Sequence, residues 1–122
     1  MPSLLLVDDE KDVNEALKMY LEMHGFTVRT VFSGQEGLAA VKEAKPDLVM
    51  LDLQMTGMDG WQTLLKMREI APDIHVAILT GSVSDRDLEE KAKTSGVLGF
   101  ITKPIQLDDL VPKIKGFLAE GK

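Results

Sequence analysis

Three aspartates, a threonine and a lysine lie at or directly after the ends of short apolar runs in this sequence. They are Asp8, Asp9, Asp52, Thr80 and Lys103. If the runs form a parallel sheet, these side chains gather at one edge, outside the carboxyl ends of the strands, where α/β proteins bind ligands. Each residue alone is more often a turn former, a helix cap or a surface residue. Their occurrence together at the ends of several strands is what indicates a functional site.

The chemistry that suits this set is cation binding with phosphoryl transfer. Two like charges ~4 Å apart repel by about 4 kcal/mol at an effective dielectric constant near 20, and a divalent cation relieves that cost. Mg²⁺ prefers carboxylate, water and phosphate oxygens. The sequence has no cysteine, and no histidine near these positions, which argues against zinc. Asp52 would then act as a nucleophile toward phosphorus, with Lys103 offsetting charge on the transferred oxygens.

Five strand-length apolar runs supply the elements that must position these residues. The runs are Leu4–Val7, Phe26–Phe32, Leu48–Leu53, Ile74–Leu79 and Val97–Ile101. Continuous apolar runs of this length predict strands that are covered on both faces, as in a parallel sheet.

Helix-period segments lie between and after these runs. They are expected over about Glu10–His24, from a cap at Ser33, over about Trp61–Ile70, from Ser84 or Asp85 to near Gly96, and in a last helix that carries Leu107, Leu110 and Ile114. Glu36 completes a capping box with Ser33. If Asp108 or Asp109 is the N-cap of the last helix, Pro112 lies close to its first turn, and a later start of this helix is the alternative. The alternation predicts an α/β fold with right-handed crossovers and helices on both faces of the sheet.

Composition narrows the class of protein further. The 122 residues fit one domain, and the formal net charge of -6 argues against direct binding of a nucleic-acid backbone. No apolar run approaches the ~18 residues that a membrane span needs, and no signal peptide is visible. We therefore expect a soluble, cytoplasmic protein with no membrane or nucleic-acid partner.

In its motifs the chain resembles the receiver domains of two-component response regulators. The matching segments are LLLVDDE, DLVMLDLQMTGMDG, AILTGS and GFITKP, and their order and spacing cover essentially the whole chain. The resemblance implies a flavodoxin-like (βα)5 three-layer fold whose five-stranded parallel sheet has the order 2-1-3-4-5. It also implies that residues 1–122 form a single receiver domain with no output domain.

The resemblance assigns roles to the acidic residues and the lysine. Asp52 matches the phosphoacceptor. Asp8 and Asp9 match the pair that holds Mg²⁺ (or Mn²⁺) directly or through water, together with Asp52 and the backbone carbonyl of Gln54. Lys103 matches the lysine that contacts the phosphoryl group.

Further positions match the parts that respond to phosphorylation. Thr80 matches the switch hydroxyl and Phe100 the switch aromatic residue. Gln54 and Ser82 match positions that tune dephosphorylation, with plain surface polarity as the alternative for both. The Lys103–Pro104 peptide bond is cis in such domains.

The implied function is signalling rather than enzymatic. A sensor histidine kinase, a phosphotransfer protein or a small phosphodonor would supply the phosphoryl group to Asp52, where self-phosphorylation and self-dephosphorylation take place. The face formed by the fourth helix, fifth strand and fifth helix would then change its preference for a downstream protein. The resemblance is compatible with a monomer or a weak phosphorylation-dependent dimer.

Three residues depart from the usual pattern of receiver domains. Thr56 stands where Pro is common, Gly81 where Ala is common, and Ile105 where Phe is common.

Two other functions compete with that of a receiver domain. One is a phosphatase or mutase of the haloacid-dehalogenase type, but it needs a second Asp where Gln54 stands. The other is a phosphorylation-independent protein-binding module, which the complete set of acidic residues and Lys103 disfavours.

Overall fold

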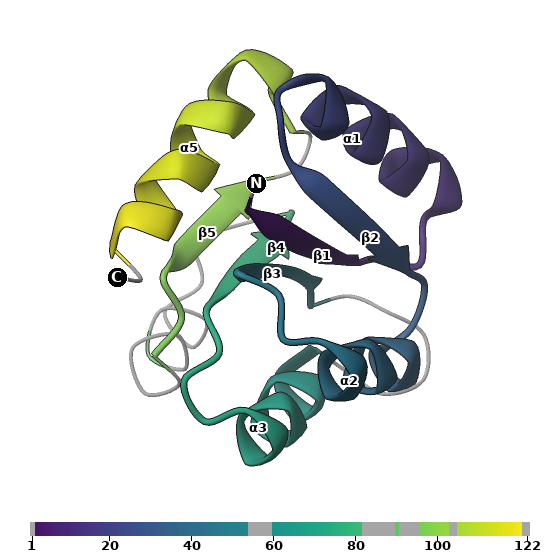
Figure 1. Ribbon diagram of the computed structural model, residues 1–122, viewed down its shortest axis with the longest axis vertical. Helices are drawn as coiled ribbons and strands as arrows, with labels where there is room; N and C mark the ends of the chain where they lie inside the picture. Colours follow the sequence, from purple (N-terminus) through teal and green to yellow (C-terminus); the bar gives the residue numbers. More distant parts are fainter. Residues whose placement is uncertain (1, 54–59, 82–89, 91–95, 103–104, 121–122) are drawn as a thin grey trace.

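The described strands form one parallel sheet in the order β2-β1-β3-β4-β5 (Figure 1). The computed structural model describes residues 2–53, 60–81, 90, 96–102 and 105–120. The strands are β1 (Ser3–Val7), β2 (Thr27–Val31), β3 (Leu48–Asp52), β4 (Val76–Thr80) and β5 (Gly99–Thr102). The predicted parallel sheet and its strand order are confirmed, and β1 and β3 lie at its centre.

Helices cover both faces of this sheet. The described helices are α1 (Lys11–Met23), α2 (Gly34–Glu43), α3 (Gly60–Ile70) and α5 (Leu107–Glu120). Figure 1 shows α1 and α5 on one face and α2 and α3 on the other. The helix expected from Ser84 or Asp85 falls mostly on residues outside the described ranges.

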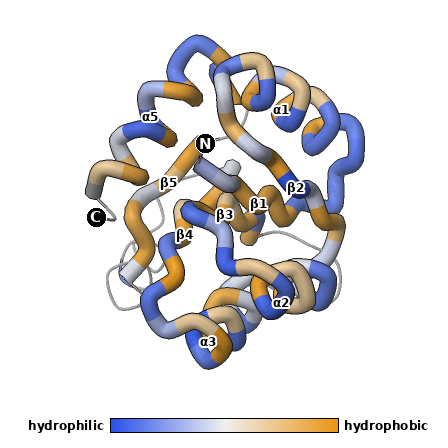
Figure 2. The backbone as a smooth tube through the Cα atoms, in the orientation of Figure 1, coloured by the Kyte–Doolittle hydropathy of each residue, from blue (hydrophilic) through white to orange (hydrophobic). Residues whose placement is uncertain are grey.

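The strands alternate their side chains between two apolar layers. Along β1, Leu4 and Leu6 join the layer under α1 and α5, whereas Leu5 and Val7 join the layer under α2 and α3. Figure 2 shows the resulting hydrophobic centre. Full burial of a side chain of this size contributes about 1.5–3 kcal/mol. Because the strands are buried on both faces, they appear in the sequence as continuous apolar runs.

The capping box predicted at the start of α2 is present. The Ser33 hydroxyl accepts a hydrogen bond from the backbone N–H of Glu36 at 3.1 Å. The Glu36 carboxylate in turn accepts from the Ser33 hydroxyl at 3.1 Å and from the backbone N–H of Phe32 at 3.3 Å. These bonds fix the direction in which the chain leaves β2 and enters α2.

The expected start of the last helix is wrong. Helix α5 begins at Leu107, so Asp108 and Asp109 lie within its first turn and Pro112 lies inside it. Negative side chains in the first turn are favourable next to the helix dipole. Pro112 removes one backbone hydrogen bond. Burial of the stripe that includes Leu110 and Ile114 holds the helix in place, because packing contributes more to helix stability in proteins than propensity does.

The packing of α2 against α3 depends on a glycine. A Cβ added at Gly34 would overlap the hydroxyl oxygen of Thr63, which is fully buried. Gly116 in α5 is the opposite case, because a Cβ there meets no described atom within 4 Å.

We therefore expect Gly34→Ala and Gly116→Ala to change stability in opposite directions. Gly34→Ala should lower the free energy of unfolding by about 1–3 kcal/mol, because overpacking outweighs the better helix propensity of alanine. Gly116→Ala should raise it by about 0.5–1 kcal/mol. Urea denaturation followed by circular dichroism measures both. A Gly34→Ala protein as stable as the parent would contradict the close packing of α2 on α3.

Candidate functional site

The carboxyl ends of the strands bring the predicted site residues to one edge of the sheet. Asp8 directly follows β1, Asp52 ends β3 and Thr80 ends β4. Val7 pairs with Leu51, so the next residues on the two central strands, Asp8 and Asp52, lie side by side. The predicted convergence of these three residues is confirmed.

These polar groups lie in the protein interior. The exposed fraction is 0% for Asp8, 3% for Asp52 and 6% for Thr80. Burial of a carboxylate is costly unless it is paired, hydrogen-bonded or bound to a metal ion. Two buried aspartates on adjacent strands therefore form an acidic site inside the protein.

A third carboxylate joins the two buried aspartates. Carboxylate oxygens of Asp8, Glu10 and Asp52 all lie within 4.8 Å of one another. Asp9, which the sequence analysis expected beside Asp8, is half-buried and does not belong to this group of described residues. Glu10 was given no role in the sequence analysis. The chain bends at Asp9, so no strand period in the sequence signals this placement of Glu10.

The backbone around Asp8 explains this placement. Glu10 has φ -86° and ψ 101°, an extended conformation, and precedes the first turn of α1. Its backbone N–H donates to Oδ1 of Asp8 at 3.0 Å. The chain therefore bends at Asp9, and this hydrogen bond closes the turn that leads from β1 into α1.

Asn14 of α1 holds the end of β1 in place. Its side-chain Nδ2 donates to the backbone carbonyl of Asp8 at 2.6 Å and to that of Val31 at 3.3 Å. The backbone N–H of Asp8 also donates to the carbonyl of Val31 at 3.2 Å. Asn14 is fully buried and was missed by the sequence analysis. Its spacing of three from Leu17, on the buried stripe of α1, was the signal.

Helix α3 comes equally close to the end of β3. A Cβ added at Gly60, its first residue, would lie 2.7 Å from the Cα of Leu53 and 2.9 Å from the carbonyl oxygen of Asp52. These distances are below normal contact, so only glycine allows the helix to start here without displacing the backbone. Gly60 thereby helps to hold Asp52 in position.

Thr80 and Phe100 lie on the same face of neighbouring strands. Phe100 pairs with Ile78, and Thr80 follows Ile78 by two residues, which returns its side chain to that face. Phe100 is half-buried and packs on the apolar layer under α2 and α3.

The other predicted positions divide between the described and undescribed parts of the chain. The calls on Gln54, Thr56, Ser82, Lys103 and Pro104 lie outside the described residues. Gly81 is exposed, and Ile105 packs on the layer under α1 and α5.

The donor set fits a hard divalent cation. The three donors are carboxylate oxygens, which suit Mg²⁺, Mn²⁺ or Ca²⁺ better than zinc. Ligands on opposite sides of Mg²⁺ lie about 4.2 Å apart, and around Ca²⁺ about 5 Å apart. Oxygens within 4.8 Å of one another can therefore contact a common ion.

The fold and this site define a doubly wound α/β protein with a cluster of carboxylates at the carboxyl edge of its sheet. Comparison with protein families gives the more specific identification. The sequence model of the response regulator receiver domain family matches residues 4–115 of this chain, and the chain belongs to this family.

Related proteins agree with this assignment. The chain is 33% identical over 122 residues to the transcriptional regulatory protein AfsQ1 of Streptomyces coelicolor, covering 100% of this chain and 53% of that protein. It is 39% identical over 120 residues to GlrR of Escherichia coli, covering 97% of this chain and 26% of that protein. The chain thus spans about half or less of the length of these relatives.

Superposition on a solved structure also supports the fold. A receiver domain protein from Methanospirillum hungatei superimposes with a TM-score of 0.91 at 27% identity, covering 99% of this chain and 96% of that one.

Within the described part of the chain, no helix is both long and apolar enough to cross a bilayer.

The role of Asn14 can be tested through stability. Asn14→Leu keeps a similar volume but removes the donor to the buried carbonyl of Asp8, so the free energy of unfolding should fall by about 1–3 kcal/mol. Gln35→Leu on the exposed side of α2 serves as the matched control and should change it by no more than about 0.5 kcal/mol. Equal unfolding midpoints for the two variants in urea would argue against the contribution of Asn14.

Proposed function

We propose that this chain accepts a phosphoryl group on Asp52. The donor is the phosphohistidine of a sensor histidine kinase or phosphotransfer protein, or a small phosphodonor. The observation that carries the proposal is the burial of Asp52 at the end of a central strand, with its carboxylate within 4.8 Å of those of Asp8 and Glu10. A buried carboxylate on a rigid strand, beside a set of cation ligands, is suited to nucleophilic attack on phosphorus.

In the transfer step, a carboxylate oxygen of Asp52 attacks the phosphorus atom. The new O–P bond forms as the P–N bond of the donor breaks, and the electron pair leaves on the imidazole nitrogen. Asp52 must be ionised for this attack. Its position at the sheet edge holds the attacking oxygen in one direction, which lowers the entropic part of the barrier.

A bound Mg²⁺ (or Mn²⁺) supplies charge neutralisation for the phosphoryl oxygens. Asp8, Asp9 and Asp52, with the backbone carbonyl of Gln54, would hold it by their match to the family motif. Lys103 would offer a point charge to a phosphoryl oxygen.

Phosphorylation then acts on the surface through Thr80 and Phe100. The Thr80 hydroxyl donates to a phosphoryl oxygen and moves toward it, which changes the space available to Phe100 on the adjacent strand. Two packings of the face formed by the fourth helix, β5 and α5 are thereby given different populations. A downstream protein that binds one packing more tightly than the other responds to phosphorylation.

The acyl phosphate is removed by water. Gln54 and Ser82, which stand two residues beyond Asp52 and Thr80, would govern how water reaches the phosphorus. Their side chains would thus set the lifetime of the signal without taking part in the acceptance of the phosphoryl group.

Beryllofluoride, which imitates a phosphoryl group on an aspartate, tests the acceptor. With Mg²⁺ present, its addition should shift the backbone amide signals of Thr80 and Phe100 in NMR spectra of the wild-type chain. The Asp52→Ala variant should show no such shift. A response of the same size in both proteins would place the acceptor elsewhere.

The switch is tested by comparing Thr80→Ala with Thr80→Ser. Both variants keep Asp52, but only serine keeps the hydroxyl. A hydrogen bond to a charged group contributes about 1.5–3 kcal/mol, so its loss in Thr80→Ala should shift the balance of the two packings by about tenfold or more. The shift at Phe100 on beryllofluoride addition should shrink in Thr80→Ala and persist in Thr80→Ser. Equal responses in the two variants would remove the hydroxyl from the mechanism.

A further inference from the structure

We propose that Arg68 is a positioning residue of the switch formed by Thr80 and Phe100. It holds the turn before β5 (residues 96–98) against α3 and thereby favours one of the two packings between which phosphorylation selects. The inference rests on the proposed function, because it concerns how a signal from Asp52 is received at Phe100. Arg68 lies at the amino edge of the sheet, opposite the edge that carries the carboxylates.

The guanidinium group of Arg68 joins three segments of the chain. Arg68 belongs to the last turn of α3, where a positive charge is favourable next to the helix dipole. Its Nη1 donates to the backbone carbonyl of Ile74, just before β4, at 3.3 Å. Its Nη2 donates to the backbone carbonyl of Gly96, just before β5, at 3.1 Å. A residue that only ended α3 would not need this second contact, which lies 28 residues further along the chain.

The turn before β5 is held from two sides. Gly96 has a φ of 70°, in the left-handed region that favours glycine. A Cβ added at Gly96 would lie in ordinary contact with Nη2 of Arg68, at 3.7 Å, so the guanidinium group lies directly against the turn. Two residues later, the backbone N–H of Leu98 donates to the carbonyl of Val76 in β4 at 2.8 Å. Arg68 and β4 together therefore fix where β5 begins.

The apolar layer under α2 and α3 connects this turn with Phe100. Val97 and Phe100 both pack on that layer, which includes Met67, the residue before Arg68. Phe100 also pairs with Ile78 on the neighbouring strand β4. Because closely packed interiors transmit displacements, a shift of the turn relative to α3 changes the position available to Phe100.

The Nε atom of Arg68 carries a cost that structural packing alone does not explain. This atom is buried and makes no hydrogen bond within the described part of the chain. A buried N–H without a partner costs free energy, which an apolar side chain of similar length would avoid. The contact with Gly96 biases the switch if only one packing makes it. The packing described here makes it, and the packing favoured by phosphorylation lacks it.

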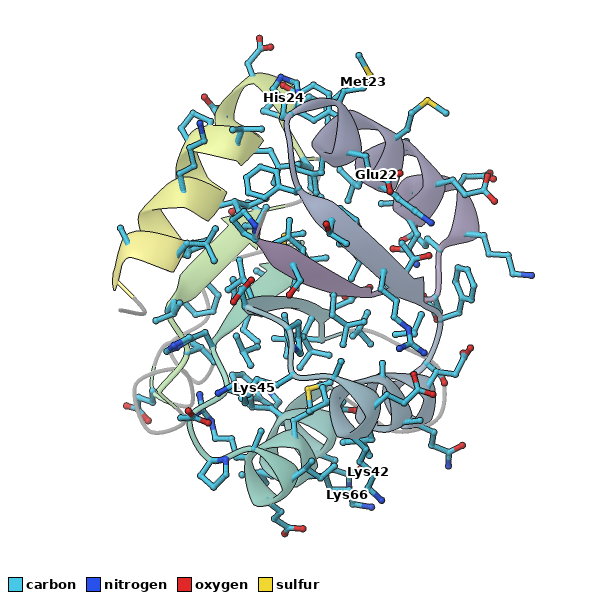
Figure 3. The ribbon with its side chains drawn as sticks, viewed as in Figure 1. Glu22, Met23, His24, Lys42, Lys45 and Lys66 are labelled. Carbon is cyan, nitrogen blue, oxygen red and sulfur yellow. The ribbon has the colours of Figure 1, made fainter. Side chains whose placement is uncertain are left out.

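NMR spectra of the unphosphorylated chain test this inference. Arg68→Met removes the donors and keeps the length of the side chain. Lys66→Met is the matched control, because it removes the same charge from the exposed side of α3, where Figure 3 labels Lys66. In Arg68→Met the amide signal of Phe100 should move toward its position in the beryllofluoride form. The shift should correspond to about a threefold to tenfold gain in the second packing, as expected for the loss of one hydrogen bond. Lys66→Met should leave the signal in place.

Titration with beryllofluoride in the presence of Mg²⁺ gives a second readout. A ligand that binds one packing binds more tightly overall when that packing is more populated. The beryllofluoride concentration at half response should therefore fall in Arg68→Met by the same factor. A purely structural role of Arg68 would lower the urea concentration at which the chain unfolds, but it would move neither the Phe100 signal along this line nor the apparent affinity.

Arg68→Lys provides the test if Arg68→Met does not fold. Lysine keeps the positive charge, but its single ammonium group does not reproduce the planar fork that reaches two carbonyls. The same two measurements should change in the same direction, by about twofold, because part of the contact is kept.

Two outcomes would overturn the inference and leave the proposed function standing. One is a folded Arg68 variant whose Phe100 signal and beryllofluoride affinity equal those of the wild-type chain, while the response that depends on Asp52 is intact. The other is an equal shift in Arg68→Met and Lys66→Met, because the loss of charge alone would then explain it. A wild-type chain that shows no response to beryllofluoride would contradict the proposed function itself, and this inference with it.

Discussion

The burial of carboxylates at the end of an apolar sheet is the constraint on which the rest of this structure depends. Asp8 and Asp52 stand side by side at the ends of the two central strands, almost without contact with solvent. Charges in such a place are tolerated only when other groups balance them, and their mutual repulsion is strong at this distance. This arrangement supports the proposal that the carboxylates hold a cation beside Asp52.

The remainder of the fold offsets that cost and keeps the carboxylates in place. Two apolar layers cover the sheet, so β1 and β3 are buried and closely packed on both faces. Asn14 fixes the backbone of Asp8, and Gly60 allows α3 to press against the backbone of Asp52. The site is thus supported from α1 on one face and from α3 on the other. Its geometry depends on packing rather than on the acidic residues themselves.

Local patterns predicted some features well and others poorly, for identifiable reasons. The capping box at Ser33 and Glu36 was predictable because it needs only residues three apart. The start of α5 was not, because Pro112 favours a later start locally and the burial of Leu110 and Ile114 overrides that preference. The strand order came from the resemblance to a family, since alternating runs fix the class of fold but leave the order of the strands open.

By itself, the sequence determined the βα alternation, the five apolar runs and the location of Asp8, Asp52 and Thr80 at strand ends, because these follow from local periodicity and from the rule that parallel strands share one carboxyl edge. Only the tertiary structure decided that Glu10 rather than Asp9 meets Asp8 and Asp52, and that Asn14 holds the turn between β1 and α1. The physical reason is that these contacts depend on where the chain leaves its extended path and how closely helix and strand approach. Those quantities are set by packing between segments that are far apart in the chain.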